Sequence, residues 1–401
     1  GGSGPAGAAA PAVPRRLSAP GAEEPRRPLE LLAQAELDAA TTGYWEDVEG
    51  SLPPDSLGSL SRYAACSLYL GPKSDLGKLE GTPIPEDVMK TPHARRFAGW
   101  ANRSRCHEYR FISNASADSS LHPYSWATRE SAQRCLQGRW IAFWGDSTTR
   151  LAFSSMVDFL AGGIETPSFP THDWSYDLHA DTLDKCKESE NQGDAQELAC
   201  HLAAHIPESR TTVTFNWVTS MRLWPSLKRT LAAFQDKEQF PNLLLDAVPD
   251  LLLINSGPWE VYELNGWDGW IGSDRYTQVF DSWLEHEFGE LVEQGQRGAG
   301  QVKTKLMMLG NTACPKGKKL LCKVHGVPCT EKMWDLADLQ RSILKRKAAE
   351  LDMEDSVRWV DARSLYDPLP NKYRCKGSGF HLPAVVTDAR VNHVLHAACG
   401  R

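Results

Sequence analysis

From Gly138 onward, apolar runs of strand length alternate with longer segments of helical period. Strands that alternate with helices form parallel sheets with right-handed crossovers. The pattern therefore predicts a three-layer α/β/α sandwich around a parallel sheet of about five strands. Strands are expected at 139–144, 211–217, 249–255, 304–310 and 356–361. Helices are expected at 148–161, 226–235, 273–295, 331–352 and 384–398.

The segments before and within this pattern divide the chain further. Residues 1–28 are rich in Ala, Pro and Gly and read as a disordered stalk or linker. Residues 29–135 begin with a short helix at 29–40 and continue as a loop-rich region that wraps around the core and is stapled by disulfides. Residues 136–401 form the main domain, with a polar, irregular insertion at 162–210.

Composition excludes several classes of protein. The 401 residues are 41% hydrophobic and 24% charged, which is typical of a globular domain, and a net charge of −7 argues against nucleic-acid binding. No apolar run has the length of a membrane span, so we expect any membrane anchor to lie outside this sequence. Zinc at Cys322, His325 and Cys329 would match no standard site, and we expect neither metal nor cofactor.

Ten cysteines and two N-glycosylation sequons, Asn102-Arg103-Ser104 and Asn114-Ala115-Ser116, favour an oxidising secretory compartment. Sequence does not determine the connectivity of the disulfides. Candidate pairs are Cys375 with Cys399, which would tie a late loop to the last helix, and Cys186 with Cys200.

The tripeptide Gly145-Asp146-Ser147 joins the apolar run 140–144 to the helical pattern that follows it. The Ser147 hydroxyl is thereby placed at the carboxyl end of a strand and the amino end of a helix. Free N–H groups at a helix start can stabilise an oxyanion. The tripeptide also occurs in ordinary turns and helix N-caps, which is the alternative interpretation.

Two further segments complete a candidate site. The Gly-rich loop 375–383 carries His381, a candidate general base for a serine nucleophile. The strand at 249–255 ends at Asn255, whose side chain could donate to an oxyanion. Strand ends of a parallel sheet share one edge, so these segments are expected to line one crevice.

The order of these motifs resembles that of SGNH-type esterases, which implies a flavodoxin-like form of the sandwich. The closer resemblance is to the PC-esterase branch, which contains the plant trichome-birefringence-like polysaccharide O-acetyltransferases. It extends in layout over residues 43–401. The segments that carry it, besides Gly145-Asp146-Ser147 and the loop with His381, are Gly43-Tyr44-Trp45, His122-Pro123-Tyr124-Ser125-Trp126, the strand 139–144 and Asn255-Ser256-Gly257-Pro258-Trp259.

The resemblance implies roles for individual residues. Ser147 would be the nucleophile and His381 its base. The Ser147 N–H and the Asn255 side chain would form the oxyanion hole, with Arg150 or Gly257 assisting. The reaction would pass an acetyl group through an acyl-serine to a sugar hydroxyl or to water.

One position departs from the family pattern. The family usually places Asp three residues before the catalytic His, and here that position is Ser378. A serine cannot supply the charge that stabilises imidazolium. Asp361 or Asp367 could replace it, the enzyme could use a Ser-His dyad, or the protein could have lost activity and only bind.

Tryptophans suggest the substrate. Trp259, Trp267 and Trp270 follow a strand end and read as one lip of a glycan groove, with His172 and Trp174 on the opposite wall, although buried Trp residues more often anchor a core. Three functions remain open: an O-acetyltransferase of polysaccharide or glycan, a carbohydrate esterase, and a non-catalytic glycan-binding protein. The expected partners are a glycan and an acyl donor, and the expected location is the Golgi lumen, as a type II membrane protein, or outside the cell.

Overall fold

The computed structural model describes parts of the main domain and of the N-terminal region. The described residues are 29–47, 109–114, 124–161, 201–218, 220–221, 224, 226–235, 243, 245, 248–261, 263–264, 267–268, 272–297, 304–311, 323–324, 327–369 and 384–400.

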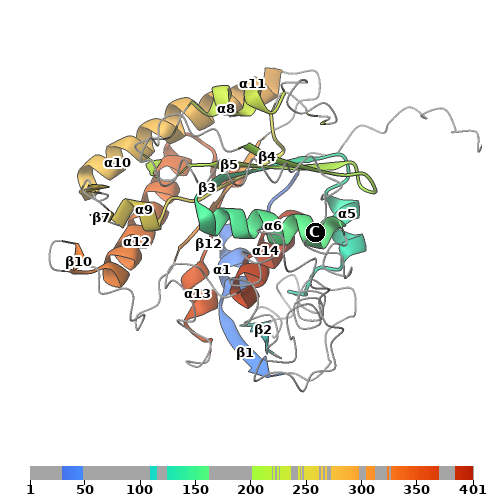
Figure 1. Cartoon of the computed structure of the whole chain (residues 1–401), viewed down its shortest axis with the longest axis horizontal. Coiled ribbons are helices and arrows are strands. Elements are labelled where there is room, and N and C mark those ends of the chain that lie inside the picture. The colour runs from blue at the N-terminus through green and yellow to red at the C-terminus, as the bar shows by residue number, and fades with distance from the viewer. Residues whose placement is uncertain are drawn as a thin grey trace, which may run out of the picture.

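A six-stranded sheet forms the centre of the protein (Figure 1). Its order is β12-β9-β6-β3-β5-β4, and every neighbouring pair is parallel except β4 with β5. All five predicted strands are confirmed within two residues at each end. The bounds are β3 Trp140–Gly145, β4 His201–Ile206, β5 Thr211–Trp217, β6 Leu251–Ile254, β9 Lys305–Leu309 and β12 Val357–Val360.

Strand β4 was not expected. It lies at the end of the segment 162–210, for which the sequence predicts irregular structure, and it pairs antiparallel with β5 at one edge of the sheet. Its sequence His201-Leu-Ala-Ala-His-Ile206 holds two alanines, which have low strand propensity, so pairing with β5 rather than local preference explains its formation.

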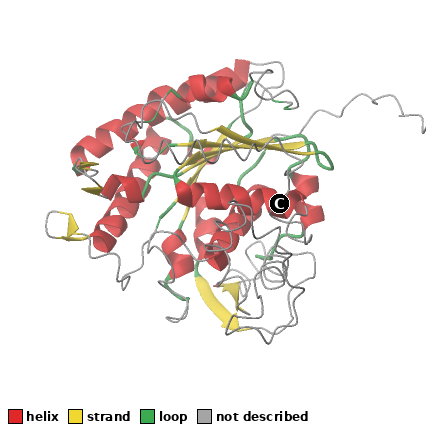
Figure 2. Ribbon diagram, in the orientation of Figure 1, coloured by secondary structure: helices red, strands yellow, loops and turns green. Residues whose placement is uncertain are grey.

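Helices cover both faces of the sheet and make the predicted three-layer sandwich (Figure 2). One face is covered by α5 Arg129–Cys135, α6 Ser147–Ala161 and α14 Ala384–Cys399. The other is covered by α8 Leu227–Ala233, α10 Ser273–Ser282, the π-helical turn η4 Trp283–Phe288, α11 Gly289–Arg297 and α12 Cys329–Glu350.

The side chains of β3 explain why both faces must be covered. Ile141 and Phe143 pack into the core beneath α6 and α14, whereas Trp140, Ala142 and Trp144 pack into the core beneath α10 to α12. All of these side chains are buried. A continuous apolar run is typical of a parallel strand that is buried on both sides.

The described parts of the N-terminal region form a third, smaller core. Helix α1 Gln34–Thr41 and the antiparallel pair β1 Gly43–Asp47 and β2 Tyr109–Ser113 pack against α13 Ala362–Tyr366 and α14. The Trp45 Nε1 donates to the Leu365 carbonyl over 2.7 Å. The remaining short elements are α9 Pro258–Val261, β7 Glu263–Leu264, β8 Trp267–Asp268, β10 Lys323–Val324, β11 Val327–Pro328 and η5 Glu354–Ser356.

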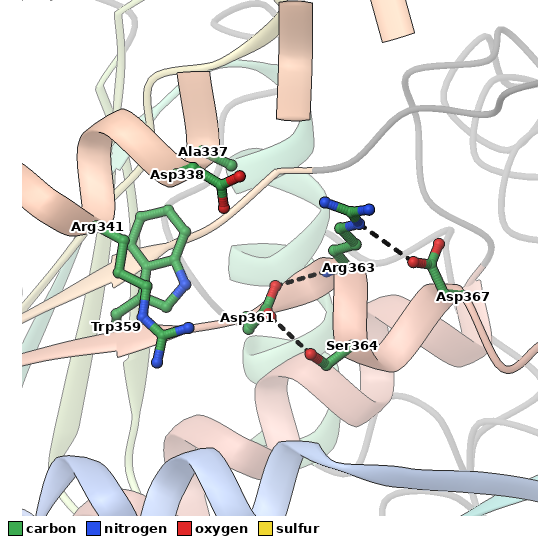
Figure 3. A pocket seen from close by; sticks show the side chains of 8 residues that line it. All are labelled: Ala337, Asp338, Arg341, Trp359, Asp361, Arg363, Ser364 and Asp367. Atoms are coloured by element: carbon green, nitrogen blue, oxygen red, sulfur yellow. Dashed lines mark hydrogen bonds and ion pairs between the residues drawn. The ribbon is translucent and has the colours of Figure 1, made fainter. Parts of the chain in front are cut away.

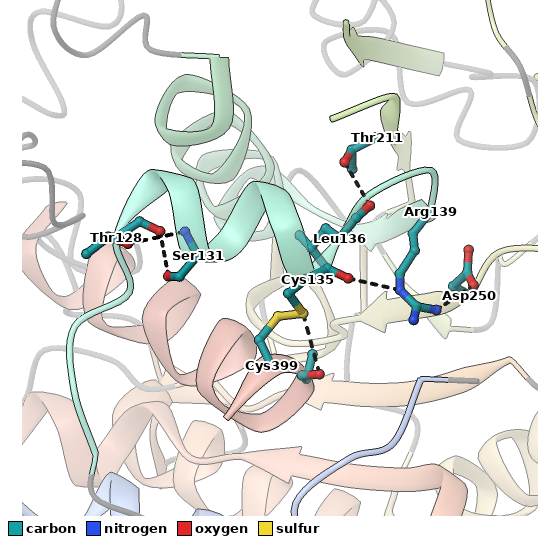
Figure 4. Close-up of a disulfide and its surroundings, with 9 residues drawn as sticks. Thr128, Ser131, Cys135, Leu136, Arg139, Thr211, Asp250 and Cys399 are labelled. Atoms are coloured by element: carbon teal, nitrogen blue, oxygen red, sulfur yellow. Dashed lines mark hydrogen bonds and ion pairs between the residues drawn. A yellow bond between two sulfur atoms is a disulfide. The ribbon is translucent and has the colours of Figure 1, made fainter. Parts of the chain in front are cut away.

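A disulfide joins Cys135 at the end of α5 to Cys399 at the end of α14 (Figure 4). The candidate pair of Cys375 with Cys399 is therefore wrong. Helices α5 and α14 pack against each other, which brings the two Cα atoms within 5.7 Å. The other candidate pair, Cys186 with Cys200, lies outside the described residues.

Two features are absent from the described residues. None of their helices combines the length and the apolar character needed to cross a bilayer. They also contain no group of three or more His, Cys, Asp or Glu side chains arranged to bind a metal ion. Cys322 and His325, two of the three residues considered for zinc, are not among them.

Candidate active site

The order of the strands places a switch point between β3 and β6. From β3 the chain crosses through α6 to the β4–β5 side of the sheet, and then returns to β6 on the opposite side of β3. Open α/β sheets bind ligands in the crevice at the carboxyl ends of strands that flank such a point. The Gly145-Asp146-Ser147 turn follows β3 and Asn255 follows β6, so both predicted site segments lie there.

The turn after β3 is capped by Asp146. Helix α6 begins at Ser147, and the Asp146 carbonyl accepts the Arg150 N–H over 2.9 Å. The Asp146 Oδ1 accepts the Thr148 N–H over 2.8 Å and the Thr148 hydroxyl over 2.7 Å. Asp146 is thus the N-cap, and Ser147 is the first residue of the helix. The Ser147 side chain itself lies outside what the structure describes.

Gly145 permits the close approach of β3, β6 and α6. A Cβ atom at this position would lie 2.3 Å from the Thr149 Oγ1 and 2.9 Å from the Asn255 carbonyl oxygen. The second of these atoms is backbone and cannot move aside without shifting β6. Only glycine therefore fits where the strand enters the turn.

A buried network connects the ends of β3, β6 and β9. The Asn311 Nδ2 donates to the Asn255 Oδ1 over 2.8 Å, and the Thr148 hydroxyl lies 3.3 Å from the Asn311 Oδ1. The Asn255 Nδ2 donates to the Leu309 carbonyl. Asn255 and Asn311 are 0% and 4% exposed. The network fixes the three strand ends relative to one another, and the role of Asn255 as an oxyanion donor stays a prediction.

Asn311 is a site residue that the sequence analysis missed. It follows the apolar strand β9 in the same way that Asn255 follows β6, and this repeated pattern would have identified it. Gly257 belongs to the same contact, since a Cβ there would lie 1.6 Å from the Asn311 Nδ2. Gly257 therefore has a steric role in addition to its predicted place at the oxyanion hole.

Arg150 lies one turn into α6. Its guanidinium carbon is 5.0 Å from the centre of the Trp217 ring, at the carboxyl end of β5. This cation–π contact holds the Arg150 side chain towards β5. Its predicted assistance at the oxyanion hole is not tested by this geometry.

Glu260 is a buried carboxylate next to the site. It is 0% exposed, and it accepts hydrogen bonds from the Ser220 hydroxyl, the Met221 N–H and the Ser256 hydroxyl. These bonds tie the segment after β5 to the start of α9. Glu260 directly follows Trp259 of the predicted lip, but it has an internal, structural position.

The predicted substrate lip is described only in part. Trp259 is partly buried in α9, and the backbone of Trp267 lies in β8. Trp270, His172, Trp174 and the predicted base His381 lie outside the described residues. Their roles stay predictions.

Both candidate triad acids lie after β12, beside a pocket of about 260 Å³ (Figure 3). Asp361 caps α13: its Oδ1 accepts the Arg363 N–H over 2.9 Å and its Oδ2 accepts the Ser364 hydroxyl over 2.6 Å. Asp367 is exposed and pairs with the Arg363 Nε over 3.2 Å. Asp361 therefore already has a structural partner on each oxygen, and neither acid is assigned to His381 by these contacts.

Asp146 and Arg390 are both buried, and each influences the pKa of the other. Burial raises the pKa of Asp146, and the Thr148 hydrogen bonds and the charge of Arg390 offset part of that rise. Burial lowers the pKa of Arg390 to about 10, against the opposing influence of Asp146. Each group thus favours the charged form of the other.

Comparison with known proteins gave distant structural likenesses. No protein-family model and no curated protein matches the chain. A protein described as a GDSL-like lipase from Parabacteroides merdae is 12% identical over 66% of this chain and 97% of its own, with a TM-score of 0.33. A variant of an acetyl-xylooligosaccharide esterase from Geobacillus stearmophilus is 13% identical over 67% of this chain and 97% of its own, with a TM-score of 0.34.

Proposed function

We propose that this protein is an acyltransferase that moves an acetyl group onto a glycan through a covalent acyl-Ser147 intermediate. The observation that carries the proposal is the position of residue 147. It is the first residue of α6, directly after the capping Asp146, at the strand edge beside the switch point of the sheet. A nucleophile there is next to N–H groups that point out of the helix start towards a developing oxyanion.

The proposed reaction has two steps. The Ser147 hydroxyl attacks the acyl carbon of the donor and transfers its proton to His381, and the leaving group departs with that proton. A sugar hydroxyl then attacks the acyl-serine, His381 accepts its proton, and the proton returns to Ser147 as the ester of the sugar is released. Both steps pass through an oxyanion at the start of α6.

The pocket after β12 supports a polar acceptor. It lies at the same sheet edge as the Ser147 turn, because β12, β9, β6 and β3 are parallel. Its lining combines carboxylates and guanidinium groups, and such groups can hydrogen-bond to a sugar. The Cys135–Cys399 disulfide supports the proposal of a secretory compartment, in the Golgi lumen or outside the cell.

The test is a transfer assay with a radiolabelled acetyl donor, with and without oligosaccharide acceptors. We expect label on the sugar, and we expect a tryptic peptide containing Ser147 to carry the acetyl group when acceptor is omitted. Ser147→Ala should abolish both signals, while Ser154→Ala, a buried serine later in α6, should retain them.

The outcomes separate the three functions. Release of free acetate at the same rate with and without sugar would identify a carbohydrate esterase instead of a transferase. Glycan binding without label on protein or sugar would identify a non-catalytic binder. Full activity of Ser147→Ala would exclude the proposed nucleophile.

A further inference from the structure

Gln340 on α12 holds the peptide group that joins Ser256 to Gly257, just after β6. Gln340 is 1% exposed, and its Nε2 donates to the Ser256 carbonyl over 2.5 Å and to the Tyr276 hydroxyl over 2.7 Å. A carbonyl only accepts hydrogen bonds, so the amide nitrogen of Gln340, and not its oxygen, faces Ser256. A side chain of α12 therefore fixes the orientation of this peptide group.

The N–H of the same peptide group belongs to Gly257. The C=O and N–H bonds of a trans peptide point in opposite directions, so this N–H points away from α12. Because α12 and α6 cover opposite faces of the sheet, the Gly257 N–H is turned towards the face on which α6 begins. Gly257 is buried, and none of the described residues accepts a hydrogen bond from its N–H. Such a group is rare, and an oxyanion would be a suitable partner for it.

Glu260 holds the same turn against the segment that follows β5. Its carboxylate accepts hydrogen bonds from the Ser256 hydroxyl, the Ser220 hydroxyl and the Met221 N–H. Its own N–H donates to the Gly257 carbonyl over 2.9 Å. Strands β5 and β6 lie on either side of β3, so this carboxylate connects the segments that flank the carboxyl end of β3.

Backbone hydrogen bonds join these segments to the turn that carries Ser147. The Asn255 N–H donates to the Trp144 carbonyl over 2.9 Å, and the Val218 N–H donates to the Gly145 carbonyl over 3.0 Å. Asn255 is thus in contact with the end of β3, close in sequence to the peptide group that Gln340 holds. The turns after β3 and β6 therefore meet at the carboxyl edge of the sheet.

We propose that Gln340 is a positioning residue for acyl transfer, acting through the Ser256 carbonyl. It directs the Gly257 N–H into the oxyanion hole, opposite the N–H groups at the start of α6, and Glu260 keeps the turn from rotating. Donors from the two turns then share the charge of the oxyanion. This inference rests on the proposed function of Ser147.

The test is the burst of p-nitrophenol released from p-nitrophenyl acetate, which measures acylation of Ser147. Gln340→Met keeps the size of the side chain but removes the donor. It should slow acylation about 10- to 100-fold with little change in KM, because the displaced N–H acts on the transition state and not on the bound substrate. The matched control is Ile343→Val, a small change at a buried position on the same face of α12, which should leave the acylation rate unchanged.

Two further measurements separate positioning from a purely structural role. Gln340→Glu should be slowest at high pH and should regain rate relative to the wild type as the pH falls, because a protonated carboxyl can again donate to the Ser256 carbonyl. Methylboronic acid forms a tetrahedral anion with a serine hydroxyl, so Gln340→Met should weaken its inhibition by about the same factor as it slows acylation. Equal losses of rate in Gln340→Met and Ile343→Val, or undiminished inhibition of a slow Gln340→Met, would overturn the proposal.

Amide hydrogen exchange tests the inference without activity. In Gln340→Met, peptides from 255–261 should exchange faster than in the wild type, while peptides from β5 should be unchanged. If the wild type shows no burst, the proposed function fails, and exchange alone decides whether Gln340 holds the turn. Unchanged exchange at 255–261 would overturn the positioning role whatever the activity.

Discussion

Two adjacent threonines at the start of α6 are both buried but use their hydroxyl groups differently. The Thr148 hydroxyl donates to Asp146 and lies near Asn311, whereas the Thr149 Oγ1 has no hydrogen-bond partner among the described residues. Comparing a variant at each position therefore separates two contributions to the free energy of unfolding: that of the Thr148 hydrogen bond and that of changing any buried threonine. Valine replaces the hydroxyl by a methyl group with little change of shape.

We expect Thr148→Val to lower the free energy of unfolding by about 1–3 kcal/mol, because it removes a hydrogen bond from a buried carboxylate. Thr149→Val should be neutral or stabilising, since no described hydrogen bond is lost. Urea denaturation measures both, and the acetyl-transfer rate should fall only in Thr148→Val. Equal destabilisation by the two variants would contradict the network described for Asp146.

Gly257 provides a second prediction for single residues. Its Cβ would displace the Asn311 amide from Asn255, so Gly257→Ala should cost about 1–3 kcal/mol of stability and reduce activity. The matched control is Gly289→Ala at the start of α11, where the nearest atom would be the Leu284 carbonyl oxygen at 3.6 Å. That variant should be more stable than the wild type by up to about 1 kcal/mol. Thermal melting and the transfer assay distinguish the two, and a Gly257→Ala variant as stable as the wild type would contradict the prediction.

Sequence could locate site residues only where a strand pattern preceded them. Asn255 and the residues around Ser147 follow apolar runs, and their positions at strand ends could be predicted for that reason. The Asn255–Asn311 contact and the hydrogen bond of Ser155 to Asp388 join segments that are far apart in the chain. No local pattern reports such contacts, because they arise from the packing of β6 against β9 and of α6 against α14.

Among the elements, α14 connects most parts of the molecule. It covers one face of the sheet, contacts α5 and α6, and packs against the N-terminal elements α1 and β2. Its last turn is linked to α5 by the Cys135–Cys399 disulfide, which spans 264 positions of the chain. A crosslink over such a distance restricts the unfolded chain strongly.

Replacing both cysteines, Cys135→Ala with Cys399→Ala, should lower the free energy of unfolding by about 2–4 kcal/mol. Urea denaturation of the variant and the wild type measures the loss. Peptide mapping without reductant should recover a crosslinked peptide containing Cys135 and Cys399. A peptide that joins Cys375 to Cys399 would instead support the pairing considered from sequence.

The elements that sequence predicted correctly are those with long, regular patterns. The five parallel strands and the helices of the main domain fall into this class. Strand β4 was missed because its alanines carry little strand signal, and the β1–β2 pair could not be predicted because its strands are separated by 61 residues of chain. Strand β4 forms by pairing with β5, the next strand in the chain, whereas the β1–β2 pair joins segments that are far apart in the chain.

At the scale of the whole molecule, the N-terminal elements are attached to the main domain around a buried histidine. His393 on α14 is 0% exposed; its Nε2 lies 2.8 Å from the Ala40 carbonyl oxygen of α1, and its Nδ1 lies 2.6 Å from the Ala389 carbonyl oxygen. Tyr124 and Phe111 pack their rings against it. No charged side chain of the described residues contributes to its titration.

This histidine predicts a pH dependence of stability. Burial lowers the pKa of His393, and the two carbonyl contacts offset part of the shift. Below the unfolded pKa of about 6.5, the unfolded chain binds a proton that the folded protein does not, so stability falls as the pH falls. The slope contributed by His393 should approach about 1.4 kcal/mol per pH unit between the two pKa values.

The measurement compares urea unfolding of the wild type and His393→Gln from pH 8 to pH 5. Taking the difference between them removes the contribution of other groups, including Asp146, whose raised pKa acts with the opposite sign because its folded form releases a proton less readily. The difference in free energy of unfolding between the wild type and His393→Gln should be constant above about pH 6.5, where His393 is neutral in both states. Below that pH, the wild type should lose stability relative to the variant. If the wild type instead gains stability relative to His393→Gln as the pH falls, folding favours the imidazolium, with both ring nitrogens donating to the carbonyls of Ala40 and Ala389. In that case acid would strengthen the attachment of α1 to α14 instead of weakening it.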